Sequence, residues 1–181
     1  PYIDEIKTTI FGDYTSEFAA MRAGQIDLNR AQGFTKIDAD VLKKSGLKLT
    51  AYDDTIAAVW GLYFNMSKKP FNDVRVRKAV ALAIDPLDTI EGAYKGGALP
   101  TGFLSSAILQ YAWPPEKALQ KFKPDRDAAK RLLAEAGYGP GQLRFTMDAG
   151  NIPTEAPAAE ITQKQLVAVG IEAKIAPQNG A

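Results

Sequence analysis

Apolar residues recur at every third or fourth position in several parts of the chain, and this spacing predicts amphipathic helices. Three of these helices follow a residue that can cap the first turn, namely Asn72 or Asp73, Asp85 before Pro86, and Asp125. The remaining helices are predicted from a cap at Thr15 or Ser16 up to Gly24, over residues 37–44 and over residues 156–169.

Short runs rich in β-branched and aromatic residues lie between these helices and predict strands. They occupy residues 3–11, 25–29, 47–52, 55–65, 143–148 and 171–176. The run 55–65 is so densely apolar that both of its faces are expected to be covered. Residues 98–124 show no period and several prolines, which indicates a long surface connection with possible short turns.

Alternating strands and helices are typical of an α/β fold with parallel or mixed sheets and helical covers. Two βαβ-like regions flank residues 55–65, and the later one, residues 143–176, is expected to cross over right-handedly. The pattern therefore predicts two lobes, with residues 1–57 in the first and residues 58–181 in the second.

The composition is that of a folded globular protein, with 46% hydrophobic and 24% charged residues in 181. A net charge of +1 gives no general attraction to nucleic acid or to an anionic membrane. No apolar run approaches the roughly 20 residues of a membrane span. The start at Pro1 lacks the pattern of a signal peptide, and both ends are expected to be internal to a longer polypeptide.

Cysteine and histidine are both absent, which excludes thiolate or imidazole catalysis and nearly all transition-metal sites in this chain. We expect no cofactor and no bound metal. The adjacent acids Asp53 and Asp54 would point to opposite faces of a strand, unlike the paired carboxylates of a glycosidase. The glycines of residues 92–97 follow a helix instead of preceding one, so they do not form a phosphate loop.

The order of motifs from residue 65 to residue 85 resembles the signature of family 5 extracellular solute-binding proteins. This stretch reads Asn-Met-Ser-Lys-Lys-Pro-Phe-Asn-Asp-Val-Arg-Val-Arg-Lys-Ala-Val-Ala-Leu-Ala-Ile-Asp. Three further stretches are similar to that family in the same order, at residues 6–28, 124–138 and 163–171. The resemblance therefore covers nearly the whole chain, although the family's first segment, its small extra domain and the end of its far lobe have no counterpart here.

The resemblance implies part of a periplasmic-binding-protein-like type II fold and a function without catalysis. By this likeness the chain is the substrate-binding component of an ABC importer, or a fragment of it, that captures peptides or peptide-like solutes between two lobes. Its partners would be the ligand and a membrane permease, in the periplasm or anchored by lipid at the cell surface. Two other hypotheses stay open: a small carboxylate-dependent hydrolase, and a protein-interaction module.

Four residues are candidate ligand contacts. By resemblance, the run that contains Trp60 and Tyr63 passes near the crossing between the lobes, where aromatic rings can pack on a solute. Arg30 and Gln32 follow the strand predicted at 25–29, and loops after strand carboxyl ends face the ligand crevice in α/β sheets. A guanidinium there can hold a carboxylate, and an amide can pair with a peptide group. For each residue the alternative is an ordinary core or loop position.

The helix after Asp73 carries the most concentrated basic charge, at Arg75, Arg77 and Lys78. Without interleaved aromatic residues this pattern favours a hydrated face over a nucleic-acid site. The apolar positions expected to be buried in the same helix are Val74, Val76, Ala79, Val80, Ala83 and Ile84.

Overall fold

A computed structural model describes residues 2–29, 34–50, 59–105, 108, 110–150 and 152–178. Its internal contacts divide the chain into two compact units, Pro1–Ala51 and Tyr52–Ala181. The predicted lobe boundary after residue 57 and the division between the units both fall within residues 51–58, which lie outside the described residues. The assignment of the two units to two lobes stays a prediction.

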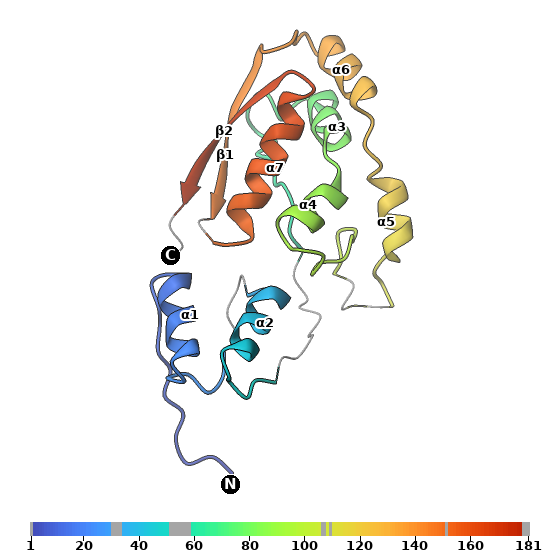
Figure 1. The fold of residues 1–181 in the computed structure, drawn as a ribbon. Coiled ribbons are helices and arrows are strands. Elements are labelled where there is room, and N and C mark those ends of the chain that lie inside the picture. The colour runs from blue at the N-terminus through green and yellow to red at the C-terminus, as the bar shows by residue number, and fades with distance from the viewer. Residues whose placement is uncertain are drawn as a thin grey trace. The chain divides into compact units, whose positions relative to one another are not determined.

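The first unit contains the helices α1 (Tyr14–Arg22) and α2 (Lys36–Lys44), both of which were predicted (Figure 1). The cap of α1 is Asp13, whose carboxylate accepts the Ser16 N–H at 2.8 Å, and not Thr15 or Ser16 as predicted. Helix α2 begins at a capping box, in which Thr35 accepts the N–H of Asp38 and the Asp38 carboxylate accepts the N–H of Thr35.

A small cluster of aromatic side chains joins α1 and α2 of the first unit. Tyr14 and Phe18 of α1 meet Phe34, which precedes α2, with ring centroids 5.2 and 5.8 Å from that of Phe34. Burial and a hydrogen bond with the Asp38 carboxylate raise the pKa of Tyr14 above its ordinary value. These side chains hold α1 and α2 together where the sequence supplies few aliphatic core residues.

The strands predicted in the first unit are absent from its described residues. Residues 3–11, 25–29 and 47–50 form no ladder, and Ile3, Ile6 and Ile10 are 69%, 79% and 92% exposed. The reason is physical, because β-branched residues favour extended backbone but a strand also needs a partner that accepts its N–H and C=O groups. No such partner lies beside these segments in the described part of the chain.

The described residues of the second unit form a two-stranded parallel sheet and five helices (Figure 1). The helices are α3 (Val74–Ala83), α4 (Pro86–Gly92), α5 (Pro115–Lys121), α6 (Arg126–Glu135) and α7 (Glu155–Val167), and the strands are β1 (Leu143–Gly150) and β2 (Ile171–Gln178). The register runs from Leu143 opposite Ile171 to Gly150 opposite Gln178. The predicted βαβ unit at residues 143–176 is therefore confirmed as β1, α7 and β2.

Local sequence signals place the helix starts of this unit correctly. Asp73, Asp85 and Asp125 each cap the following helix by accepting a backbone N–H, from Arg75, Leu87 and Ala128 respectively. Helix α5 differs from the prediction of a connection with short turns over residues 98–124. Its Pro115 occupies the first helical position, which suits proline. Val74 was expected to be buried but is 49% exposed at the first turn of α3.

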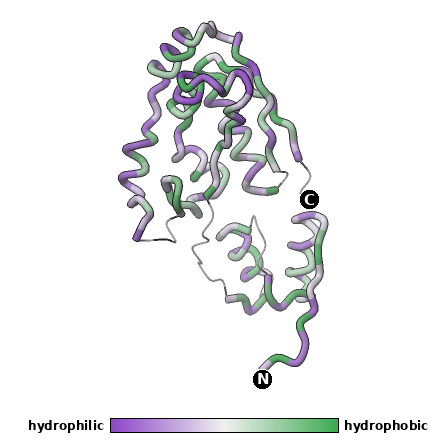
Figure 2. Tube along the Cα trace, turned by 180° about the vertical axis from the view of Figure 1, so that it is seen from behind, coloured by the Kyte–Doolittle hydropathy of each residue, from purple (hydrophilic) through white to green (hydrophobic). Residues whose placement is uncertain are grey.

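The core of the second unit lies between α3, α6 and α7 and one face of the sheet. α3 packs on α6, and α7 packs on both strands and on α4. In Figure 2 hydrophobic and hydrophilic positions alternate along these helices. The buried cluster consists of Val76, Ala79, Val80, Ala83, Ala129, Leu133, Leu143, Leu166, Val169, Ile171 and Ala173. The opposite face of the sheet carries polar side chains over most of its length, with Arg144 paired to Glu172 at 2.8 Å.

A prediction about folding follows from the turn between α7 and β2. Gly170 has φ of +86°, and a Cβ added there would lie 3.0 Å from the Cα of Pro140. Gly137 has φ of +89° with open space around it. Alanine at either position is strained, because both residues have left-handed backbone angles. Only at Gly170 would the added Cβ also press against the backbone of Pro140. Gly170→Ala should therefore lower the free energy of unfolding by about 1 kcal/mol more than Gly137→Ala. Urea unfolding of both variants measures the difference, and equal losses would contradict the close approach.

Candidate functional site

The carboxyl ends of β1 and β2 lie at the same end of the sheet, where α7 begins (Figure 1). An open hollow of about 520 Å³ lies beside this end, between α7 and β2. Its lining residues are Ala149, Gly150, Ala156, Glu160, Gln163, Lys164, Lys174, Ile175 and Pro177. In open α/β sheets the crevice at the strand carboxyl ends is the usual place of a ligand.

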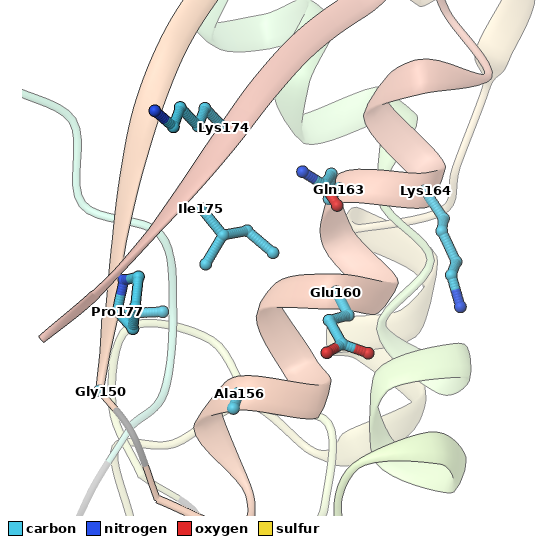
Figure 3. Close-up of a pocket in the computed structure, with 9 residues that line it drawn as sticks. Gly150, Ala156, Glu160, Gln163, Lys164, Lys174, Ile175 and Pro177 are labelled. Carbon is cyan, nitrogen blue, oxygen red and sulfur yellow. The ribbon is translucent and has the colours of Figure 1, made fainter.

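The lining combines an apolar wall with four polar side chains, those of Glu160, Gln163, Lys164 and Lys174. Figure 3 shows Ile175 directed toward α7 and Gln163 directed toward the strands, whereas Lys164 points away from them. Ala156, Glu160 and Gln163 share one face of α7 because they are spaced four and three residues apart. Such a surface can pack on an apolar group and hydrogen-bond a polar one, but it holds no nucleophile and base pair.

A hydrogen bond from the backbone to a side chain helps to close the turn from β1 into α7. The Gly150 N–H donates to Oε2 of Glu155 at 2.9 Å, and a Cβ at Gly150 would lie only 2.1 Å from that oxygen. A side chain at position 150 would therefore displace the Glu155 carboxylate from this hydrogen bond. Burial, and then the charge of Glu155, raise the pKa of Tyr94 to about 12, so its phenol is protonated at neutral pH.

A buried amide links α7 to the joint between α3 and α4. Gln165 is 4% exposed, and its Oε1 accepts the Asp85 N–H at 3.3 Å. Its Nε2 donates to the Asp85 carbonyl at 3.3 Å and to Oδ2 of Asp88 at 2.7 Å. The amide thus satisfies both backbone groups of the residue that caps α4.

The basic residues of α3 have structural partners. Arg75 pairs with the Asp73 carboxylate at 2.6 Å and donates to the carbonyl of Glu135, the last residue of α6, also at 2.6 Å. Arg77 donates to the Phe71 carbonyl at 2.7 Å. The hydrogen bonds from Arg75 hold the pKa of Asp73 below its ordinary value. Two of the three cations therefore hold the ends of α3 and α6.

Trp60 and Tyr63 lie in an extended segment, residues 59–65, that forms no strand. The expectation that both faces of this run are covered is wrong for these residues, because Trp60 is 49% and Tyr63 86% exposed. The Tyr63 hydroxyl donates to the Val59 carbonyl at 3.4 Å. Only the end of the segment is packed, where Phe64 contacts Phe71 and Phe71 contacts Phe145 of β1, each at 4.9 Å between ring centroids.

Arg30 and Gln32 lie outside the described residues, as do Asp53 and Asp54. Whether the four predicted ligand contacts form one site therefore stays a prediction. The structure adds the hollow beside α7, which the sequence does not predict because Ala156, Glu160 and Gln163 have the spacing of an ordinary helix face. The only signal for them was their place after a strand in a βαβ unit.

Within the described ranges, no three acidic side chains approach closely enough to hold a metal ion. The helices of those ranges are too short or too polar to cross a membrane.

Comparison with known proteins shows one family along the whole chain. The model of bacterial extracellular solute-binding proteins, family 5, middle region, matches residues 1–181. Heme-binding protein A of Haemophilus influenzae is 30% identical over 146 residues, which are 77% of this chain and 24% of that protein. The dipeptide-binding protein of Escherichia coli is 31% identical over 121 residues, 63% of this chain and 22% of the relative.

Solved structures show the same fold relationship. The periplasmic binding protein DppA of Helicobacter pylori, in complex with the peptide STSA, is 26% identical with a TM-score of 0.73. The match covers 93% of this chain and 31% of that one. The chain thus spans between a fifth and a third of the length of these three proteins. Its mixed α/β fold matches part of a periplasmic binding protein, and the chain belongs to the family 5 extracellular solute-binding proteins, a family of non-enzymatic receptors of ABC transporters.

Proposed function

We propose that this chain is part of the substrate-binding component of an ABC importer and serves the capture of peptides or peptide-like solutes. The observation that carries the proposal is the family match over residues 1–181 together with relatives named for a dipeptide and, at 26% identity over 97% of this chain, for glutathione. Such a receptor works in the periplasm or anchored by lipid at the cell surface, and delivers its ligand to a membrane permease.

Capture in this proposal is a matter of differential affinity. A cleft between two lobes closes when the ligand makes contacts in the closed form that the open form lacks. Peptide groups need alternating donors and acceptors, and apolar side chains need walls such as Ile175 and Pro177. No step of this function needs a nucleophile, so the carboxylate-dependent hydrolase is the weaker hypothesis.

The four candidate contacts stay part of the proposal. Trp60 and Tyr63 are exposed enough to pack against a solute, whereas a core role would have buried them. Arg30 and Gln32 rest on their sequence position alone, after the run at residues 25–29. In this proposal Arg30 holds a peptide carboxylate and Gln32 pairs with a peptide group.

The test of Trp60 uses intrinsic fluorescence, because Trp113 is the one other tryptophan. In a Trp113→Phe variant we expect the emission of Trp60 to shift when a dipeptide or glutathione is added. Calorimetry on the same samples verifies binding independently. An unchanged spectrum at calorimetrically saturating ligand would remove Trp60 from the site.

The substrate class has its own test. Native mass spectrometry and calorimetry of the receptor polypeptide should detect peptides and not haem, although one relative is named for haem. Neither histidine nor cysteine is present in this chain to ligate iron. Binding of haem with no binding of any peptide would reverse the substrate assignment while leaving the family membership intact.

A further inference from the structure

The long connection at residues 98–124 has no role in the proposed capture of a solute. Helix α5 lies within this connection, on the far side of the second unit from the sheet (Figure 1). Connections of this length usually serve a function of their own. Aromatic rings and lysines gather around α5, and their contacts indicate what this surface can bind.

The aromatic part of this surface is centred on Trp113. Its ring packs on Gly102, where an added Cβ would lie 3.2 Å from Cε3 of Trp113, and its centroid is 6.4 Å from that of Phe122. Phe103, the next residue after Gly102, is 91% exposed, and Phe122 is 37% exposed. Rings that are open to solvent on one surface are typical of a place where a protein contacts a partner.

Three lysines lie next to these rings. Nζ of Lys117 is 5.1 Å from the centre of the Trp113 ring, while Lys121 lies one turn further along α5 and Lys123 directly follows Phe122. All three lysines are exposed, and none forms an ion pair with a carboxylate of the described residues. Their positive charge is therefore available to an anionic partner.

The surface of an anionic lipid bilayer fits both parts of this surface. Helices that lie on membranes combine lysines with tryptophan and phenylalanine, whose rings enter the boundary between headgroups and acyl chains. A lysine keeps its aliphatic stem along apolar surface and its ammonium among lipid phosphates, and each such cation strengthens binding about fivefold. The whole chain carries a net charge of only +1, so the attraction is local.

We propose that α5 and its flanking residues bind the surface of an anionic lipid bilayer. The contact residues, here called the α5 patch, are Phe103, Trp113, Lys117, Lys121, Phe122 and Lys123. The second unit then lies on the membrane without crossing it. This contact goes beyond the proposed function, because it holds a receptor at the membrane of its permease independently of any solute.

The test measures cosedimentation of the 181-residue chain with vesicles. We expect binding to vesicles of equal parts phosphatidylglycerol and phosphatidylcholine, and none to phosphatidylcholine alone. High salt should weaken the binding, because ions screen exposed charges. Replacing Lys117, Lys121 and Lys123 together by glutamine should weaken it about 100-fold.

A matched triple variant removes the same charge elsewhere. Lys43, Lys78 and Lys174 are exposed on α2, α3 and β2, and their replacement by glutamine should weaken binding less than about threefold. Equal losses in the two triple variants would overturn the proposal, because binding would then follow net charge alone. Absence of binding to the anionic vesicles would also overturn it and would leave a protein as the partner of the patch.

Trp113 supplies a local readout in a Trp60→Phe variant, where it is the one tryptophan left. Brominated acyl chains quench a tryptophan that lies at the bilayer surface, so we expect brominated phosphatidylglycerol to quench the emission of Trp113. Vesicle-bound protein with unquenched Trp113 would show that another surface makes the contact, which would overturn the proposal. No step uses a peptide, so this proposal and the proposed capture of peptides succeed or fail separately.

Discussion

Replacing Leu166 by alanine is expected to lower the free energy of unfolding of the second unit by about 2–5 kcal/mol. Leu166 is fully buried on α7, in the cluster where that helix meets α3 and the sheet. The substitution removes three side-chain carbon atoms, Cγ and the two Cδ methyl groups, and leaves a cavity that the neighbouring side chains fill only in part. Urea denaturation, monitored by circular dichroism and extrapolated to water, measures the loss.

Val167→Ala is the matched control, because Val167 is the next residue of α7 and is 59% exposed. Its truncation should change the free energy of unfolding by less than about 0.5 kcal/mol, since exposed substitutions cost little and alanine favours the helix. Similar losses for the two variants would mean that α7 does not pack on β1 and β2 as described. The hollow beside α7 would then have no fixed wall.

The helices could be predicted from sequence because the signals that define them are local. Each of three helices is capped by an aspartate that accepts a backbone N–H two or three residues later, at Asp73, Asp85 and Asp125. After α6, Gly137 adopts the left-handed conformation expected at the end of a helix. The βαβ unit could be predicted equally well, because its two paired strands are separated in sequence by a single helix. Helix α5 is hard to predict because several prolines lie near it. Pro115 at its first position is nevertheless a signal for the start of a helix.

The remaining strands could not be predicted, because a strand is defined by a partner that can lie far away in sequence. Ile6 and Ile10 have the right side chains, and the run that contains Trp60 is even richer in strand formers. Neither segment is paired in the described residues. β-propensity indicates an extended backbone, but it does not predict whether that segment pairs with another strand.

The sequence predicts the kind of site and its approximate region, but not the side chains that form it. Family motifs around residues 65–85 predicted a solute-binding protein, which the family match confirms. They could not predict that Gln163 would reach a strand edge and Gln165 the core, because glutamine reads as a surface residue at either position. Gln163 and Gln165 are two residues apart, so their side chains leave α7 in directions that differ by about 200°. Only the packing of α7 determines which of the two is buried.

Gln165→Leu should lower the free energy of unfolding by about 2–3 kcal/mol, although leucine is apolar and similar in volume. The Asp85 N–H and carbonyl would both lose their hydrogen-bond partner at the start of α4. Asp88 is exposed and can turn to water, so its lost bond adds little. The cost therefore comes from two backbone groups left unpaired beside a buried side chain.

Gln163→Leu separates this effect from the general loss of a glutamine on α7. Gln163 makes one hydrogen bond, to the carbonyl of Ala173, whereas Gln165 pairs with two backbone groups, so we expect a smaller loss of about 1 kcal/mol. Amide exchange supplies the local readout, because the Asp85 amide should exchange faster in Gln165→Leu and unchanged in Gln163→Leu. Equal losses of stability with an unchanged Asp85 amide would show that Gln165 does not fix the joint between α3 and α4. That joint is what orients α4 against α7, so its rigidity determines how firmly the carboxyl end of the sheet is held for a ligand.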